Sequence, residues 1–204
     1  MGTYLLGVFA IEYCLIDSLP IGVVNFAHSK QQHRWYGHAA YGFNASKKET
    51  VYGFRLHALM SESGIILDYA LVPANVADIH IAPQLLRRVR AVEVLGDKAY
   101  LDNELHARLR EDPRRQVAVV TPRRLNQKRQ HPRSLTRAIN SLRKGIEAVF
   151  SQLAGQLNIE RNRAKCMSGL ISRIHTKLAA HALGQYINLI TDRPINDLAS
   201  LKLV

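Results

Sequence analysis

The fold is most clearly indicated by the stretch Val92-Glu93-Val94-Leu95-Gly96-Asp97-Lys98-Ala99-Tyr100. Its apolar, partly β-branched run ends in Gly-Asp, which is typical of a buried strand that delivers a carboxylate to the end of a sheet. Open α/β folds place their ligand chemistry at such an end. The stretch therefore predicts a strand over residues 92–97 and makes Asp97 a candidate functional residue.

Alternating and three-four spacings of apolar residues predict the other elements. The expected strands cover residues 11–17, 50–60, 65–72 and 117–120, and the expected helices cover 79–90, 102–110, 134–156 and 168–190. Ser18, Leu19 and Pro20 are expected to break the first strand, and residues 26–50 to form a long excursion. This order predicts an α/β fold, a mixed five-stranded sheet flanked by helices, with a C-terminal helix. We expect one domain over residues 12–190, preceded by an irregular segment 1–11 and followed by a tail 191–204.

The composition is typical of a globular protein that does not span a membrane. The 204-residue chain is 47% hydrophobic and 22% charged, as in an ordinary globular protein, and its apolar runs are too short to span a membrane. Its two cysteines form no ligand-spaced pair, which favours a reducing, cytoplasmic setting.

The positive charge lies in one part of the chain. Residues 105–180 hold 17 Lys and Arg against 4 Asp and Glu, a net of +13 in a chain whose total is +12. Such a segment predicts a polyanion partner, most simply nucleic acid, although a basic surface without a partner is the alternative. The predicted phosphate contacts are Arg123, Arg124, Lys128, Arg129, Arg133, Arg137 and Lys144, extended by Arg161 and Arg163.

Three carboxylates are placed where they can meet. Asp17 and Asp97 end two predicted strands, and Glu147 borders the apolar stripe of the helix over 134–156. Buried acids repel one another unless a cation neutralises them, and hard oxygen ligands select Mg²⁺ or Mn²⁺. Two such ions can activate a nucleophilic oxygen and stabilise a leaving oxygen in phosphoryl transfer. Each acid also has a simpler interpretation. Asp17 and Asp97 each follow a strand and can be turn formers or helix caps, although Asp102 already suits the cap after Asp97. Glu147 can be a solvated residue paired with Arg143.

Five motifs, in this order along the chain, carry a family resemblance. They are Ile16-Asp17-Ser18-Leu19-Pro20, Tyr52-Gly53-Phe54-Arg55-Leu56-His57, Pro73-Ala74-Asn75-Val76-Ala77-Asp78, Gly96-Asp97-Lys98-Ala99-Tyr100 and Arg143-x-x-x-Glu147. Together they resemble the motifs of bacterial insertion-sequence DDE transposases, over about residues 12–190.

The resemblance implies an RNase H-like fold in which Asp17, Asp97 and Glu147 bind two Mg²⁺ or Mn²⁺ ions. It implies cleavage at transposon ends to release a 3′-hydroxyl that attacks target DNA, with no covalent protein–DNA intermediate. The implied partners are double-stranded DNA and further copies of the chain, in a homodimer or larger synaptic complex. No membrane association is implied, and the expected location is the bacterial cytoplasm, at the nucleoid. Arg143 is expected to touch a DNA phosphate or the third acid.

The chain departs from the family pattern in ways that keep other functions open. Ala99 replaces a glycine, and Asn140 and Ala154 stand where relatives often have Tyr and Lys. Relatives generally carry a helical DNA-recognition region before the first acid, so the resemblance implies an N-terminally truncated copy. The alternatives are an inactive copy that acts only as a basic DNA-binding protein, and an RNase H-like nuclease for another nucleic acid.

Two aromatic pairs in the excursion also have two interpretations. Trp35-Tyr36 and Tyr41-x-Phe43 lie between basic residues, so they suit stacking on a flipped base or a DNA end. Packing within the loop is the alternative, and we slightly favour it.

Overall fold

The protein consists of a mixed sheet with helices on both faces. The computed structural model describes residues 11–31, 33–45, 47–123 and 130–201. The strands are β1 (Tyr13–Val24), β2 (Ala40–Asn44), β3 (Glu49–Ser61), β4 (Ile66–Pro73), β5 (Glu93–Gly96) and β6 (Ala118–Val120). The α-helices are α2 (Asp78–Leu85), α3 (Asn103–Glu111), α4 (Arg133–Gly155) and α5 (Met167–Ile190). Short 3₁₀ turns connect several of them, including Phe26–Gln31, His33–Trp35, Leu86–Arg88 and Lys98–Tyr100.

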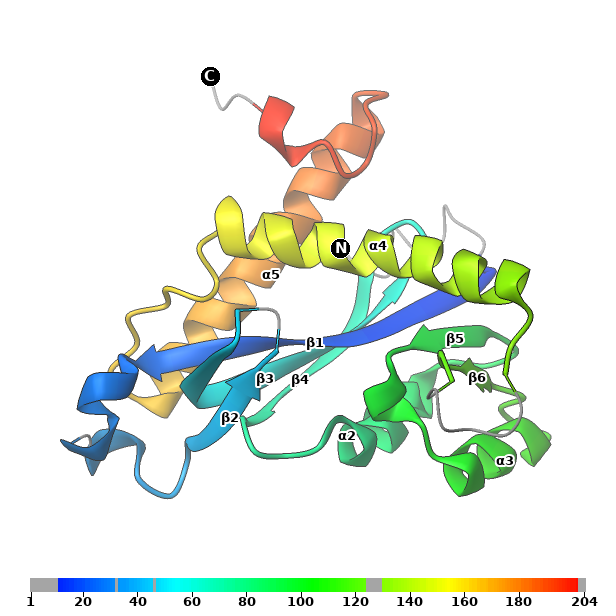
Figure 1. The fold of residues 1–204 in the computed structure, drawn as a ribbon. Helices are drawn as coiled ribbons and strands as arrows, with labels where there is room; N and C mark the ends of the chain where they lie inside the picture. Colours follow the sequence, from blue (N-terminus) through cyan, green and yellow to red (C-terminus); the bar gives the residue numbers. More distant parts are fainter. Residues whose placement is uncertain (1–10, 32, 46, 124–129, 202–204) are drawn as a thin grey trace.

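The sheet order is β2-β3-β1-β5-β6, and β4 also pairs with β3. β1 runs antiparallel to β3 and parallel to β5, and β5 runs parallel to β6. α4 and α5 cover one face, and α2 and α3 cover the other (Figure 1). The mixed α/β architecture is therefore as predicted and consistent with an RNase H-like fold, with one addition: β2 lies in the segment that was expected to be irregular.

β1 corrects a second expectation. The strand does not end at Asp17 but continues through Pro20 to Val24, paired with β3 along most of its length. β5 pairs with β1 only as far as Ile16. Beyond that residue, β3 is the only strand that pairs with β1 among the described residues. Such a one-sided position tolerates proline, because the missing amide has no ladder bond to make on the open side.

The period-two pattern of β1 separates two buried layers. Leu15 packs into the apolar layer beneath α4 and α5, whereas Cys14 and Ile16 pack into the layer with α2 and α3. α4 fits this arrangement, because its buried residues recur at three-four spacing: Ile139, Ile146, Val149, Phe150 and Leu153. The same alternation fixes which way the next residues of β1 face, and therefore where the polar groups lie.

Candidate active site

Strand register brings Asp17 and Asp97 together. Leu15 of β1 is aligned with Leu95 of β5, and Ile16 with Gly96, so the two acids follow at neighbouring positions. Both acids share the parity of the two leucines, which belong to the layer beneath α4. Gly96 permits this approach, because a Cβ atom there would lie 2.9 Å from Ile16 Cγ2.

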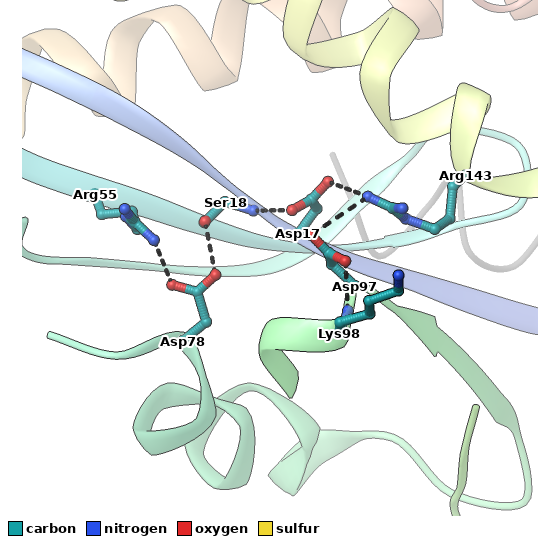
Figure 2. A network of polar contacts seen from close by, with 7 residues as sticks. All are labelled: Asp17, Ser18, Arg55, Asp78, Asp97, Lys98 and Arg143. Carbon is teal, nitrogen blue, oxygen red and sulfur yellow. Dashed lines mark hydrogen bonds and ion pairs between the residues drawn. The ribbon is translucent and has the colours of Figure 1, made fainter. Parts of the chain in front are cut away.

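Arg143 of α4 lies between these two carboxylates (Figure 2). Its Nη2 is 3.4 Å from Asp17 Oδ2 and 3.9 Å from Asp97 Oδ2. The side chains of Arg143 and Asp17 are 19% and 17% exposed, whereas Asp97 is 43% exposed. Arg143, which was expected to touch a DNA phosphate or the third acid, contacts the two strand acids in this structure.

Burial makes Asp17 costly to ionise. It raises the pKa of Asp17 to about 6, and the nearby charges of Asp97 and Asp78 act in the same direction. The backbone N–H of Ser18, which donates to Asp17 Oδ1 at 2.8 Å, and the Arg143 guanidinium oppose the rise without cancelling it. A carboxylate in this condition is stabilised by any cation that binds next to it.

Glu147 is not gathered with the other two acids. It lies one helical turn after Arg143 on α4, and its side chain is exposed. Within the described residues, which include all three acids, no group of three or more His, Cys, Asp or Glu side chains is arranged to hold a metal ion. The structure therefore pairs Asp17 with Asp97 and leaves the predicted third ligand apart.

The donor chemistry of the pair nevertheless suits a divalent metal. One cationic nitrogen of Arg143 lies within 4 Å of an oxygen of each strand acid, so the two carboxylates face a single positive charge. Carboxylate oxygens are ligands that Mg²⁺ and Mn²⁺ prefer.

Asp78 forms a second polar cluster beside Asp17, on the other side of β1. Its Oδ1 accepts a hydrogen bond from Arg55 Nη1 at 2.7 Å, and its Oδ2 accepts one from Ser18 Oγ at 3.2 Å (Figure 2). Asp78 is the first residue of α2, whose cap residue is Ala77 without a side-chain cap bond. The carboxylate is buried, and the ion pair compensates its lost hydration.

A buried histidine–tyrosine contact supports the segment after Asp97. His57 Nδ1 and the Tyr100 hydroxyl lie 3.1 Å apart, and both side chains are fully buried. Burial lowers the pKa of His57, so the ring is neutral at physiological pH. The contact ties β3 to the 3₁₀ turn Lys98–Tyr100, whose first backbone N–H donates to the Asp97 carboxylate.

None of Ser18, Arg55, His57, Asp78 and Tyr100 was among the predicted site residues. All five stand in the motifs that carried the family resemblance, and this was the available signal. Their mutual contacts join residues far apart in sequence, so spacing alone gave no reason to group them.

The predicted DNA-contacting residues fall into separate places. Arg133, Arg137 and Lys144 are exposed along α4, whereas Arg143 on the same helix turns inward to the acids. Arg161 and Arg163 are exposed in the chain after α4, a helix of about 35 Å that carries Arg133 at its other end. They therefore do not extend the segment before α4 directly.

That segment is only partly described. Arg123 lies within the described residues, whereas Arg124, Lys128 and Arg129 lie outside them.

A comparison with protein-family models places the chain. The model described as the transposase DDE domain matches residues 14–183, which include β1, β5 and α4 and therefore all three predicted acids. No curated protein and no solved structure gives a significant match. Within the described residues, no helix is long and apolar enough to cross a membrane. The match covers most of the sequence and agrees with the paired acids of the sheet, so the chain belongs to the family of transposases with a DDE domain.

Proposed function

We propose that this chain is a metal-dependent DNA transposase, which cleaves at transposon ends and transfers the released 3′-hydroxyl end to target DNA. The observation that carries the proposal is the pairing of Asp17 and Asp97 around one cationic group at the end of β5. Membership of the DDE family supports phosphodiester chemistry in general, and the acid pair is where that chemistry would occur.

In the proposed reaction, Asp17 and Asp97 hold Mg²⁺ or Mn²⁺ through their carboxylate oxygens. Glu147, one helical turn after Arg143 on α4, would supply the third ligand. The bound metal supplies activation of the attacking oxygen and stabilisation of the leaving oxygen. Arg143, whose guanidinium lies beside both acids, would donate hydrogen bonds to the phosphate under attack.

The proposed DNA path uses the exposed basic side chains of α4. Arg133, Arg137 and Lys144 are spaced so that they share one face of the helix, and they attract phosphates without reading sequence. Because the reaction joins two DNA ends, we propose that the active species contains at least two copies of the chain.

Nicking of supercoiled plasmid DNA in the presence of Mg²⁺ or Mn²⁺ tests the proposal. Asp97→Asn keeps the shape of the side chain and removes its charge, so nicking should fall by about 100-fold or more. Glu104→Gln is the matched control, because it neutralises an exposed acid close in sequence, and it should nick like the parent.

Metal binding gives an independent measure. In Mn²⁺ titrations, Asp17→Asn and Asp97→Asn should abolish binding, and Glu147→Gln should weaken it. If Asp97→Asn nicks DNA as fast as the parent chain, the proposed chemistry is wrong.

A further inference from the structure

The second half of β1 and the chain that connects it to β3 have an unusual composition. Residues 18–48 contain no Asp or Glu, but they include Lys30, Arg34, Lys47 and Lys48 together with three histidines. All exposed aromatic side chains among the described residues also lie in this segment, and they are Phe26, Tyr36, Tyr41 and Phe43. Exposed rings therefore coincide with a basic stretch of sequence that has no acid of its own, in which Lys47 is paired with Glu160 from the chain after α4.

The two members of the Trp35-Tyr36 pair, whose role the sequence left undecided, have different environments in the structure. Trp35 is 2% exposed and packs edge-on against Phe54, with ring centres 5.8 Å apart, so it anchors the segment to the core. Its neighbour Tyr36 is 84% exposed. Packing is thus correct for Trp35, whereas Tyr36 is presented to solvent from a fixed base.

The backbone around Tyr36 is held in place. The Trp35 carbonyl accepts hydrogen bonds from the N–H groups of His38 and Ala39, and also from the Tyr52 hydroxyl at 3.4 Å. Gly37 adopts a φ of 74°, a conformation that favours glycine and turns the chain directly after Tyr36. The backbone that carries the ring is therefore ordered before a ligand stacks on it, which lowers the entropy cost of binding.

A hollow of about 600 Å³ opens beside this ring. Its lining includes Tyr36, Tyr41, Lys30, His33 and Asn75, and its size is within the range of sites for small organic groups. It thus combines flat apolar rings with hydrogen-bond donors and positive charge.

Tyr41 forms a fixed wall of the hollow. Its hydroxyl lies 3.0 Å from Ser29 Oγ, and its ring packs against Tyr52 with ring centres 4.8 Å apart. The hollow is therefore largely preformed.

We propose that this surface binds unpaired bases of single-stranded DNA, with Tyr36 as the stacking residue and Lys30 and His33 toward the phosphates. Stacking requires a base whose face is open, which a paired duplex offers only at its ends, and every base has such a face. The absence of acidic residues from 18 to 48 favours a polyanion over a protein partner, whose binding surface would carry charges of both signs. The site is distinct from the acid pair and requires no metal.

Fluorescence anisotropy with labelled oligothymidylate in EDTA tests this site. The full chain should bind the single strand more tightly than a duplex of equal length, and Glu104→Gln, which changes an exposed acid outside both sites, should bind like the parent. Tyr36→Ala should weaken single-strand binding by roughly 5- to 150-fold and leave duplex binding unchanged. Tyr36→Phe keeps the ring and should bind like the parent.

Several results would overturn the proposal. One is unchanged single-strand affinity in Tyr36→Ala, and another is an equal loss of single-strand and duplex affinity. Tighter binding of oligouridylate than of oligothymidylate would assign the surface to RNA, and loss of self-association in Tyr36→Ala would assign it to a contact between copies. Thermal melting checks that Tyr36→Ala is folded. Lys30→Gln is a second variant, and it should lower the salt dependence of single-strand binding.

Discussion

Replacing Asp17 by Asn is expected to stabilise the metal-free protein at neutral pH. The folded-state pKa of Asp17 is raised from 3.8 to about 6, chiefly by burial. Between these values the folded protein binds a proton that the unfolded chain does not, so stability falls as the pH rises through the window. Above about pH 6 the full penalty of the buried charge is present, and an amide avoids it.

The magnitude follows from the size of the shift. A rise of about two pKa units corresponds to about 3 kcal/mol. Asn also loses the charged contact with Arg143, and the side chain is 17% exposed, so we expect a net gain of about 1–3 kcal/mol at pH 7. For a chain of this length each kcal/mol raises Tm by about 2–4 °C.

Urea unfolding of both proteins from pH 4 to pH 8 in EDTA measures the effect. The parent profile alone is ambiguous, because burial lowers the pKa of His57 and His181 and makes stability rise over the same range. The difference between parent and Asp17→Asn cancels those contributions. It should be small near pH 4 and reach its full value above pH 6, and Glu104→Gln should show no such difference.

Saturating Mn²⁺ should reverse the order. A ligand at about 1,000 times its Kd stabilises the parent by about 4.1 kcal/mol, which exceeds the variant's advantage, and the variant should lack this gain. The reasoning is refuted if Asp17→Asn in EDTA is less stable than the parent at pH 7, or if the difference between them does not change with pH.

Two further substitutions test the polar groups around the acids. Arg143→Gln removes a positive charge from between the strand acids, so Mn²⁺ should bind roughly 5-fold more tightly in titration calorimetry. The control Lys144→Gln should have a smaller effect. Weaker Mn²⁺ binding in Arg143→Gln would instead mean that the guanidinium holds the acids in place. Asp78→Ala leaves Arg55 largely buried without its carboxylate partner and should cost about 2–4 kcal/mol in urea unfolding. Asp78→Asn keeps a hydrogen-bond acceptor and should cost less, and equal losses below about 1 kcal/mol in both variants would show that the ion pair is unimportant for folding.

Local sequence patterns determined most of the elements of this protein. Alternating residues identified β3, β4, β5 and β6, and the three-four spacing identified α4 and α5 to within about a residue. The Gly96-Asp97 ending of an apolar run, and the equal parity of Leu15 with Asp17 and of Leu95 with Asp97, were likewise present in the sequence. These features are local, because the side-chain period of a strand or helix depends only on backbone geometry.

Tertiary structure alone decided how the polar groups meet. Whether β1 continues through Pro20 depends on which strands border it, and whether Asp17 faces Asp97 depends on the register of β1 against β5. The inward turn of Arg143, the separation of Glu147 from the acid pair and the Arg55–Asp78 ion pair depend on how helices seat on the sheet. Register and seating are set by packing between segments tens of residues apart, which a local pattern does not encode.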